Sequence, residues 1–151
     1  MRLTKQTNHA IRMLMYCAAN RDEPVSRIAD IAKSYGVSEL FLFKILQPLT
    51  KAGITQTVRG RNGGIRLGRT ADLITLLDIV RVTEDGFSMA ECFDDGGSDC
   101  PLIDMCSLNS ALREALNAFF IVLSRHTIAD LVAKKPDIRR LLNIADLKKA
   151  S

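Results

Sequence analysis

Three cysteines lie close together in a polar stretch of the chain, and they are the residues best suited to carry chemistry. Cys92, Cys100 and Cys106 fall within fifteen residues, with seven residues between the first pair and five between the second. Glycines and a proline between them favour turns, so the backbone is able to bring the three sulfurs together. Thiolates are soft ligands, which restricts a metal held by all three to zinc or an iron–sulfur cluster.

Other interpretations of these cysteines remain open at this level. A disulfide with one spare thiol fits poorly with a chain that shows no secretory signal. Spacing does not distinguish ligands from reactive or merely solvated cysteines. Zinc sites usually pair ligands two to four residues apart, and no such pair occurs here, but spacing does not decide between zinc and iron–sulfur. Cys17 lies in a helical pattern and is interpreted as a small core residue.

The charge of the chain is divided between two opposed halves. Residues 1–69 hold twelve Lys or Arg against four Asp or Glu, a net charge of +8, whereas residues 70–151 hold nine against thirteen, a net charge of −4. The basic half favours a polyanionic partner such as nucleic acid, a merely solvated surface being the alternative. Residues 84–104 contain seven acids and no base. We therefore expect the cysteines to face away from the polyanion.

Membrane proteins and enzymes are disfavoured by what the sequence lacks. There is no apolar run of 18 residues, and the first eight residues lack the apolar core of a signal peptide, so we expect a cytoplasmic protein that does not contact a membrane. Only two histidines occur. No Ser/His/Asp or Cys/His signature stands out, and we expect no catalytic activity.

Two short helices joined by a tight turn are predicted in the basic half. Ser26 is expected to cap the first, which ends at the Tyr-Gly-Val stretch 35–37, and Ser38 is expected to cap the second, which Gly53 ends. This order is typical of a helix-turn-helix. Pro48 removes a helical hydrogen bond and predicts a kink or break in the second helix.

The second of these helices has one apolar stripe and a more outward face. Leu42, Ile45, Leu46 and Leu49 form the stripe, and the outward set is Ser38, Glu39, Phe41, Phe43, Lys44 and Gln47. The two phenylalanines either pack in the core or contact thymine methyl groups in the major groove of DNA. The second alternative predicts a preference for A·T-rich sites.

A short β-hairpin with a basic tip is predicted after the helix pair. Residues 54–58 and 65–67 are the strands, and Arg59, Arg61 and Asn62 lie in the connection. A helix-turn-helix followed by such a hairpin predicts a winged helix, whose arginines are able to reach phosphates or a narrow minor groove.

Helices are expected to make up the rest of this mainly α chain. The periodicity predicts helices over residues 4–20 and 73–83, and a long helix from Ser107 to about His126 with apolar residues on two sides. A second copy of the long helix would cover its second stripe and give a homodimer. Thr127 and Asp130 begin a last short helix, and the tail after Pro136 is expected to fray. We divide the chain into a DNA-binding domain (1–83), a cysteine loop (84–106), and a dimerisation helix with its tail (107–151).

These features together resemble the Rrf2 family of winged-helix transcriptional regulators over nearly the whole chain. The resemblance rests on MRLTK at residues 1–5, VRGRNGG at residues 58–64, and three cysteines before a long helix. Residues 13–20, 38–48 and 89–93 are most similar to the iron regulators that rhizobia use within this family.

The resemblance implies that Cys92, Cys100 and Cys106 hold an iron–sulfur cluster, of the [4Fe–4S] type and degradable to [2Fe–2S] or to the apoprotein. The cluster-bearing dimer would bind a two-fold operator in double-stranded DNA and repress iron-uptake genes. Low iron, or oxidative or nitrosative attack, would degrade the cluster and release the operator. A nitric-oxide sensor of the same family, or a regulator with structural zinc, is the alternative. The residues expected to contact DNA are Arg2, Thr4, Ser38, Glu39, Phe41, Phe43, Lys44, Arg59, Arg61 and Asn62.

The fourth ligand of the cluster is left open by two departures from the family pattern. Some members place a histidine three residues after the last cysteine, where this chain has Asn109. Related nitric-oxide sensors use an aspartate of the first helix from the partner subunit, where this chain has Asn8 followed by His9. Asn8, His9, water or a small thiol would therefore complete the site.

Overall fold

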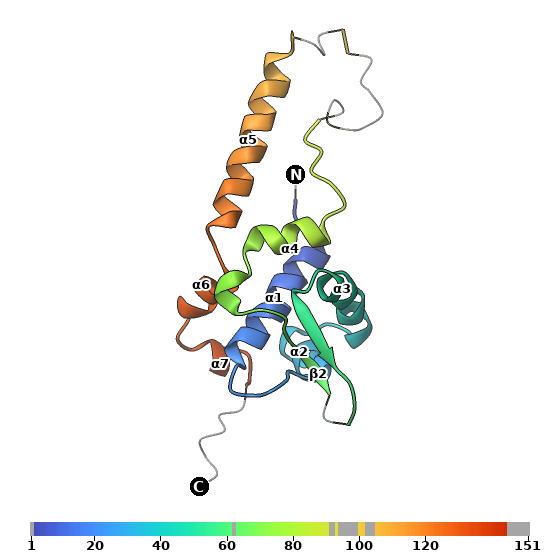
Figure 1. Cartoon of the computed structure of the whole chain (residues 1–151), viewed down its shortest axis with the longest axis vertical. Coiled ribbons are helices and arrows are strands. Elements are labelled where there is room, and N and C mark those ends of the chain that lie inside the picture. Colours follow the sequence, from blue (N-terminus) through green and yellow to red (C-terminus); the bar gives the residue numbers. More distant parts are fainter. Residues whose placement is uncertain (1, 62, 91–92, 94–99, 102–104, 145–151) are drawn as a thin grey trace.

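The computed structural model describes residues 2–61, 63–90, 93, 100–101 and 105–144 as a helical body from which one long helix projects (Figure 1). The predicted mainly α architecture with a two-stranded antiparallel wing is confirmed. None of the helices in these described ranges is long and apolar enough to cross a membrane. The elements in chain order are α1 (Lys5–Ala19), α2 (Ile28–Tyr35), α3 (Glu39–Lys51), β1 (Thr55–Val58), β2 (Gly64–Leu67), the 3₁₀ turn η1 (Ala71–Leu73), α4 (Leu76–Thr83), α5 (Ser107–Ser124), α6 (Ile128–Ala133) and α7 (Ile138–Leu141).

Helix α1 is the centre of the core. It begins where the Thr4 hydroxyl accepts a hydrogen bond from the Thr7 backbone N–H (3.2 Å). Its buried face includes Ala10, Met13 and Leu14, each fully buried. This face packs against α3, α4, α6 and β2, so helices from both ends of the sequence are built around it.

The helix-turn-helix forms as the turn residues predict. Gly36 ends α2 with a φ of 63°, a conformation that residues with a side chain rarely adopt. The Ser38 hydroxyl then accepts from the Phe41 backbone N–H (3.2 Å) and caps α3. Of the kink or break predicted at Pro48, the break is wrong, because helical residues run without interruption from Glu39 to Lys51. Bonding continues past the proline, whose carbonyl accepts from the Ala52 N–H at 3.0 Å.

The role predicted for Ser26 is wrong. Arg27 is the N-cap of α2, and Ser26 is instead 3% exposed and paired with the wing. Its N–H donates to the Ile65 carbonyl (2.7 Å) and its carbonyl accepts from the Ile65 N–H (2.8 Å). A side chain at Gly64 would collide with that Ser26 carbonyl, so glycine is needed there. The wing, with Thr57 opposite Ile65 in its register, is thereby fixed to the body.

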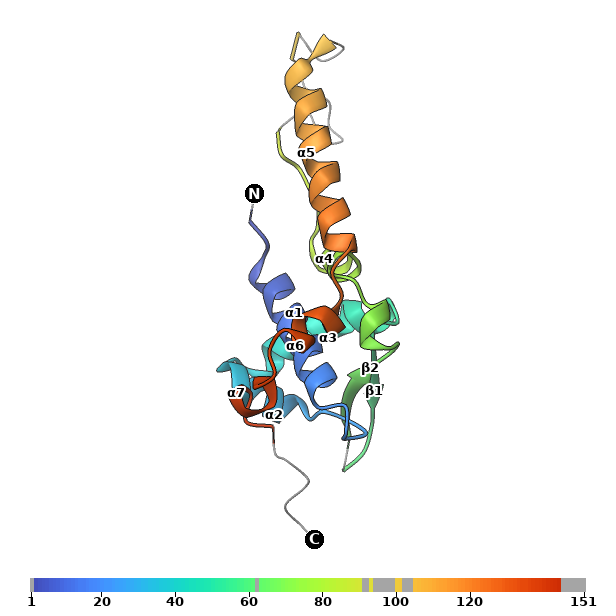
Figure 2. The ribbon, with the colours of Figure 1, turned by 90° about the vertical axis from the view of Figure 1, so that its left-hand side faces the viewer.

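Two capping boxes lie where the start of α4 meets the turn between α5 and α6. Thr75 and Asp78 cap α4, and Thr127 and Asp130 cap α6 as predicted. The helix predicted from residue 73 begins three residues later, because Thr75 takes the capping position. The two caps lie side by side: Leu76 N–H donates to the His126 carbonyl (2.8 Å), and Ile128 N–H donates to the Ile74 carbonyl (3.0 Å). Helix α5 rises from this junction and leaves the body in both views (Figure 2).

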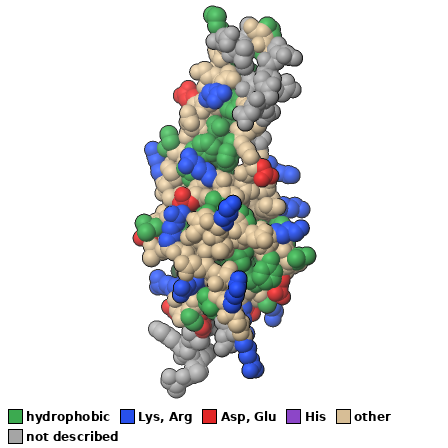
Figure 3. Space-filling view, turned by 45° about the vertical axis from the view of Figure 1, so that its right-hand side comes forward, with side chains coloured by type: hydrophobic (Ala, Val, Ile, Leu, Met, Phe, Trp, Pro, Cys, Tyr) green, Lys and Arg blue, Asp and Glu red, His purple; other side chains and the backbone are tan. Residues whose placement is uncertain are grey.

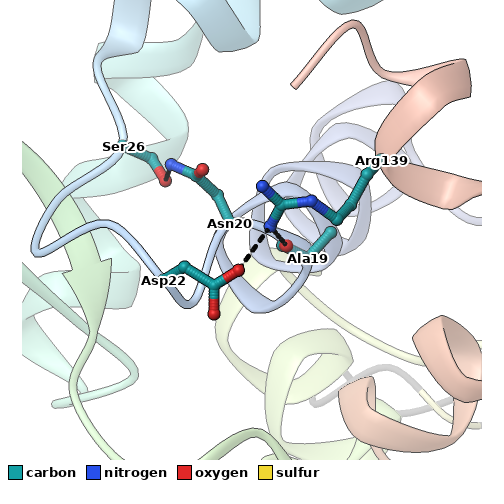
Figure 4. A network of polar contacts seen from close by, with 5 residues as sticks. All are labelled: Ala19, Asn20, Asp22, Ser26 and Arg139. Carbon is teal, nitrogen blue, oxygen red and sulfur yellow. Dashed lines mark hydrogen bonds and ion pairs between the residues drawn. The ribbon is translucent and has the colours of Figure 1, made fainter. Parts of the chain in front are cut away.

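The chain after Pro136 is ordered as far as it is described, so the predicted fraying is wrong for these residues. Ile138, Leu142 and Ile144 are buried. The Arg139 Nη1 donates to the Ala19 carbonyl (2.7 Å) and contacts the Asp22 carboxylate (3.2 Å), which ties α7 to the end of α1 (Figure 4). We call residues 136–144 the C-terminal clasp. It holds α1 and α2 from outside, since the Ser34 hydroxyl of α2 donates to the Leu142 carbonyl (2.7 Å).

Candidate nucleic-acid interface and cysteine segment

The two phenylalanines of α3, which the sequence places either in the core or against DNA, lie in different environments. Phe41 packs on the core, and its ring meets the His9 ring edge to face at 5.4 Å. Phe43 is 49% exposed and Lys44 beside it is also exposed. The core alternative therefore holds for Phe41, and Phe43 is left free to contact a partner. Leu40, which was not among the predicted contacts, is 70% exposed one turn earlier.

The wing presents its predicted arginines to solvent. Arg59 and Arg61 are both exposed at the tip, while Asn62 lies outside the described residues. The chain turns there through Gly60, whose φ is 112°. Basic side chains are spread over the lower body in Figure 3, and the described part of the cysteine segment lies at the opposite end from the wing tip (Figure 1). That the cysteines face away from a polyanion stays a prediction.

The segment before α1 is bonded to the chain that leaves α4. Glu84 ends α4, and its Oε1 accepts from the Thr4 N–H (2.8 Å), the Thr4 hydroxyl (3.1 Å) and the Thr7 hydroxyl. The hydroxyls of Thr7 and Thr83 share a further hydrogen bond of 2.7 Å. The hydroxyl of Thr4, which was predicted to contact DNA, is therefore hydrogen-bonded to Glu84, and both Thr4 and Arg2 are exposed. Sequence reasoning missed Glu84, because no local pattern joins residues eighty positions apart.

The two candidate fourth ligands differ in exposure. Asn8 is exposed on α1, and His9 is partly buried against Phe41. Burial first, and then the nearby Arg12 and Lys5 charges, lower the pKa of His9 and favour its neutral form. Its Nδ1 is buried, with no hydrogen-bond partner in the described part of the chain. Of the two side chains, Asn8 is the more exposed.

The cysteines fall into two environments. Cys17 is 7% exposed in the core, and burial raises its pKa to about 12, so it is a neutral thiol, as its helical position predicts. Cys100 and Cys106 form no disulfide with another described residue and are partly exposed, while Cys92 lies outside the described residues. Cys106 is the N-cap of α5, where its Sγ accepts from the Asn109 N–H at 3.4 Å. Within the described ranges, no three His, Cys, Asp or Glu side chains come close enough to hold a metal ion.

Aromatic side chains connect the cysteine segment, residues 84–106, to α5. The Phe120 ring meets the Phe87 ring edge to face at 4.8 Å, and the Arg81 guanidinium lies 5.8 Å from the Phe120 ring centre. Further along α5, the Arg113 guanidinium lies 4.8 Å from the centre of the Phe93 ring. The segment therefore contacts α5 at two positions, Phe120 and Arg113.

A model of the Rrf2 family, described as an iron-dependent transcriptional regulator, matches residues 3–134. The chain belongs to the Rrf2 family. Members of the Rrf2 family are DNA-binding transcriptional regulators, so this protein is a transcription regulator and not an enzyme.

Relatives in the Rrf2 family extend over almost the full chain. Protein aau3 of Rhizobium meliloti (strain 1021) is 67% identical over 97% of this chain and 94% of its own length. The HTH-type transcriptional regulator NsrR of Bacillus subtilis (strain 168) is 40% identical over 97% of this chain and 100% of its own length.

Solved structures of Rrf2 proteins share the fold. T. potens IscR superposes with a TM-score of 0.73 at 22% identity, covering 92% of this chain and 91% of its own. CymR, the global cysteine regulator of B. subtilis, gives 0.69 at 27% identity, covering 89% of this chain and 98% of its own. The predicted winged-helix fold is thereby confirmed.

Proposed function

We propose that this Rrf2 protein is a cytoplasmic repressor whose DNA binding depends on an iron–sulfur cluster and which responds to iron availability, like the rhizobial iron regulator RirA. Cys92, Cys100 and Cys106 hold the cluster, of the [4Fe–4S] type. A homodimer binds an A·T-rich, two-fold operator in front of iron-uptake genes. Loss of iron, or oxidative attack, removes the cluster and releases the DNA.

The observation that carries this proposal is the contrast between the cysteine environments. Cys17 is sealed in the core with a pKa of about 12, and a neutral buried thiol is a poor ligand. Cys100 and Cys106 are partly exposed, and Cys106 places its sulfur at the first turn of an 18-residue helix. A backbone N–H of that turn, from Asn109, donates to this sulfur at 3.4 Å. The donor set therefore fits a cluster bound by thiolates.

The position of the cysteine segment supports a role as a switch. When bound, the cluster would cross-link the segment through iron–thiolate bonds. The segment begins at Glu84, which holds the N-terminal end of α1, and ends at Cys106, which caps α5. A change within the segment thus acts on both the DNA-binding body and α5.

Helix α5 supports the homodimer. None of its residues is buried within this chain, and Leu108, Ile121 and Val122 are 63%, 50% and 51% exposed. Apolar side chains gather in the upper part of Figure 3, where α5 lies. A second copy of α5 would cover them and place two winged helices at a fixed distance, as a two-fold operator requires.

The experiment that tests the proposal starts with protein purified without oxygen. We expect broad visible absorption, about four iron and four sulfide per chain if the cluster is [4Fe–4S], and operator binding that disappears when the cluster is removed. Alanine at Cys92, Cys100 or Cys106 should abolish the cluster and specific binding together, while Cys17→Ala, the matched control, should spare both. Apoprotein that binds the operator as tightly as the cluster-bearing form, at equal salt, would refute the switch.

The alternative functions keep the same fold and cysteines. The relatives named NsrR, such as the one 40% identical to this chain, favour a regulator that senses nitric oxide. Release of DNA by stoichiometric nitric oxide, with no response to an iron chelator, would support that alternative. A colourless protein that contains zinc would instead support a structural metal.

A further inference from the structure

The most exposed apolar side chain of α3 lies at a position that the expected DNA contacts do not include. Leu40 is 70% exposed, and Phe43, three residues later, is 49% exposed. A single exposed apolar residue is common on proteins and needs no explanation. Two large ones within one helical turn form a small apolar surface, and the question is which partner would cover it.

Leu40 lies at the centre of the outward face of α3. The buried residues of the helix are Leu42, Ile45, Leu46 and Leu49. At 3.6 residues per turn, their mean direction is about 190° around the helix axis from Leu40. Phe43 lies about 60° to one side of Leu40, and the exposed Lys44 lies about 40° to the other. The face directed away from the core therefore has an apolar centre with a positive charge beside it.

DNA suits this face better than an apolar protein surface does. In a helix-turn-helix, residues near the N-terminus of the second helix contact base edges in the major groove, and Leu40 and Phe43 lie in the first half of α3. Helix α3 packs on β1, the strand that leads to the exposed Arg59 and Arg61 of the wing. Phosphates would pair with these charges and with Lys44, whereas an apolar partner would leave them without counter-charges.

The thymine methyl group is the apolar feature that a base edge offers in the major groove. Leucine has no hydrogen-bond donor or acceptor in its side chain, so it gains affinity only by covering such a group. Three residues of helix rise about 4.5 Å, and successive bases of one strand are about 3.4 Å apart along the duplex. Leu40 and Phe43 are therefore spaced to meet neighbouring base pairs.

We propose that Leu40 is a further specificity-determining residue, which together with Phe43 contacts the methyl groups of two neighbouring thymines in each operator half-site. This inference rests on the operator binding proposed above, but not on which metal the cysteines hold. It sharpens a general preference for A·T-rich DNA into a requirement for methyl groups at two adjacent positions.

The test removes single methyl groups from the DNA. The cluster-bearing protein first selects its sites from a pool of random-sequence duplexes, and the consensus duplex becomes the probe. Each thymine of the half-sites is then replaced in turn by deoxyuridine, which lacks the methyl group and keeps the base-pairing edge. At two neighbouring positions we expect the wild type to bind about fourfold more weakly for each methyl group removed, the value of one buried CH₂-sized group.

The protein variants assign each methyl group to one side chain. Leu40→Ala should lose the response to deoxyuridine at one of the two positions, and Phe43→Ala should lose it at the other, as a double-mutant cycle detects. Leu40→Met keeps an apolar side chain of similar volume and should keep the response. Leu141→Ala is the matched control, because Leu141 is also a leucine and is 65% exposed, but on α7. This control should bind and respond as the wild type does.

The outcomes separate this inference from the function on which it rests. Selection that yields no consensus sequence would refute the proposed operator binding and this inference together. A consensus whose affinity responds to deoxyuridine equally in the wild type and in Leu40→Ala would refute the role of Leu40 alone. A Leu40→Ala protein with an altered oligomeric state and an unchanged response to deoxyuridine would show that a protein covers this face, and would overturn the inference.

Thermal melting checks that the effect belongs to the interface. Because Leu40 is 70% exposed, Leu40→Ala should melt at the temperature of the wild type. A loss of affinity without a change in melting would support a contact with DNA. A melting temperature lowered as far as in Phe41→Ala would show that Leu40 serves the fold and would contradict the proposed contact.

Discussion

Phe41 and Phe43 lie on the same helix but differ in burial, so their replacement by alanine should have different effects. Phe41→Ala should lower stability, whereas Phe43→Ala should lower operator affinity. Phe41 is partly buried against the core and His9, so Phe41→Ala should destabilise the fold by about 3 kcal/mol, the lower end of the range for buried aromatic rings. For a chain of this size that corresponds to a melting temperature lower by roughly 6 to 12 °C. Phe43 is 49% exposed, so Phe43→Ala should cost about 1 kcal/mol or less in stability.

DNA binding should show the opposite order. If Phe43 contacts thymine methyl groups, Phe43→Ala should weaken binding to an A·T-rich operator by about 1 to 3 kcal/mol, or roughly 5- to 150-fold. Binding to a random duplex at the same salt should hardly change. The assay is fluorescence anisotropy with both duplexes, together with thermal melting of each variant. A Phe43→Ala protein that melts as low as Phe41→Ala, with its operator preference unchanged, would refute the assignment of Phe43 to the interface.

Three further predictions test the wing, the Glu84 hydrogen bonds and the C-terminal clasp. Arg59→Ala or Arg61→Ala should weaken binding to operator and random DNA alike. Each variant should also lower the slope of log affinity against log salt by about one for each phosphate that it no longer neutralises. Unchanged binding to both duplexes would show that the wing does not contact DNA. Glu84→Ala leaves Thr4 and Thr7 without their acceptor, so it should lower stability by about 1 to 2 kcal/mol and weaken operator binding. Glu84→Gln keeps an acceptor oxygen and should therefore lose less stability and less affinity. Equal losses in the two variants, measured by thermal melting and fluorescence anisotropy, would contradict the hydrogen-bonding role. Arg139→Ala should lower the free energy of unfolding in urea by about 1 to 2 kcal/mol, because the Ala19 carbonyl and Asp22 lose their donor. Arg140→Ala should lower it by close to zero, because the pair of Arg140 with Asp137 is exposed. The reverse order would show that the clasp is held by other interactions.

Features determined by neighbouring residues were predictable from the sequence. Ser38 caps α3 because its hydroxyl meets an N–H three residues later, and Gly36 ends α2 because the chain needs a positive φ there. Thr127 and Asp130 form a capping box within four residues. In each case the signal and the structure it specifies lie within one turn of the chain, so the residue types suffice.

Features that depend on distant partners were not predictable in the same way. Ser26 carries the residue type of a helix cap, but pairing with Ile65 takes its backbone into the wing. The chain after Pro136 has the appearance of a fraying tail until α1 and α2 offer an apolar surface to Ile138 and Leu142. Glu84 is one of the seven acids in residues 84–104, and only the fold brings it to Thr4. The three-cysteine ligand set stays a prediction, since Cys92 lies outside the described residues.

The packing of α6 and the C-terminal clasp around α1 has a consequence for synthesis of the protein. Helix α1 leaves the ribosome first, yet the residues that finish its core, such as Ile128 and Ile138, follow more than a hundred positions later. At roughly 5 to 20 residues per second, the apolar face of α1 waits on the order of 6 to 25 seconds for its last partners. A premature stop codon anywhere before the clasp would therefore yield a chain with an open core, which cellular proteases remove. Late nonsense mutations should behave genetically as complete loss of the regulator, even though α3 and the wing would both have been translated.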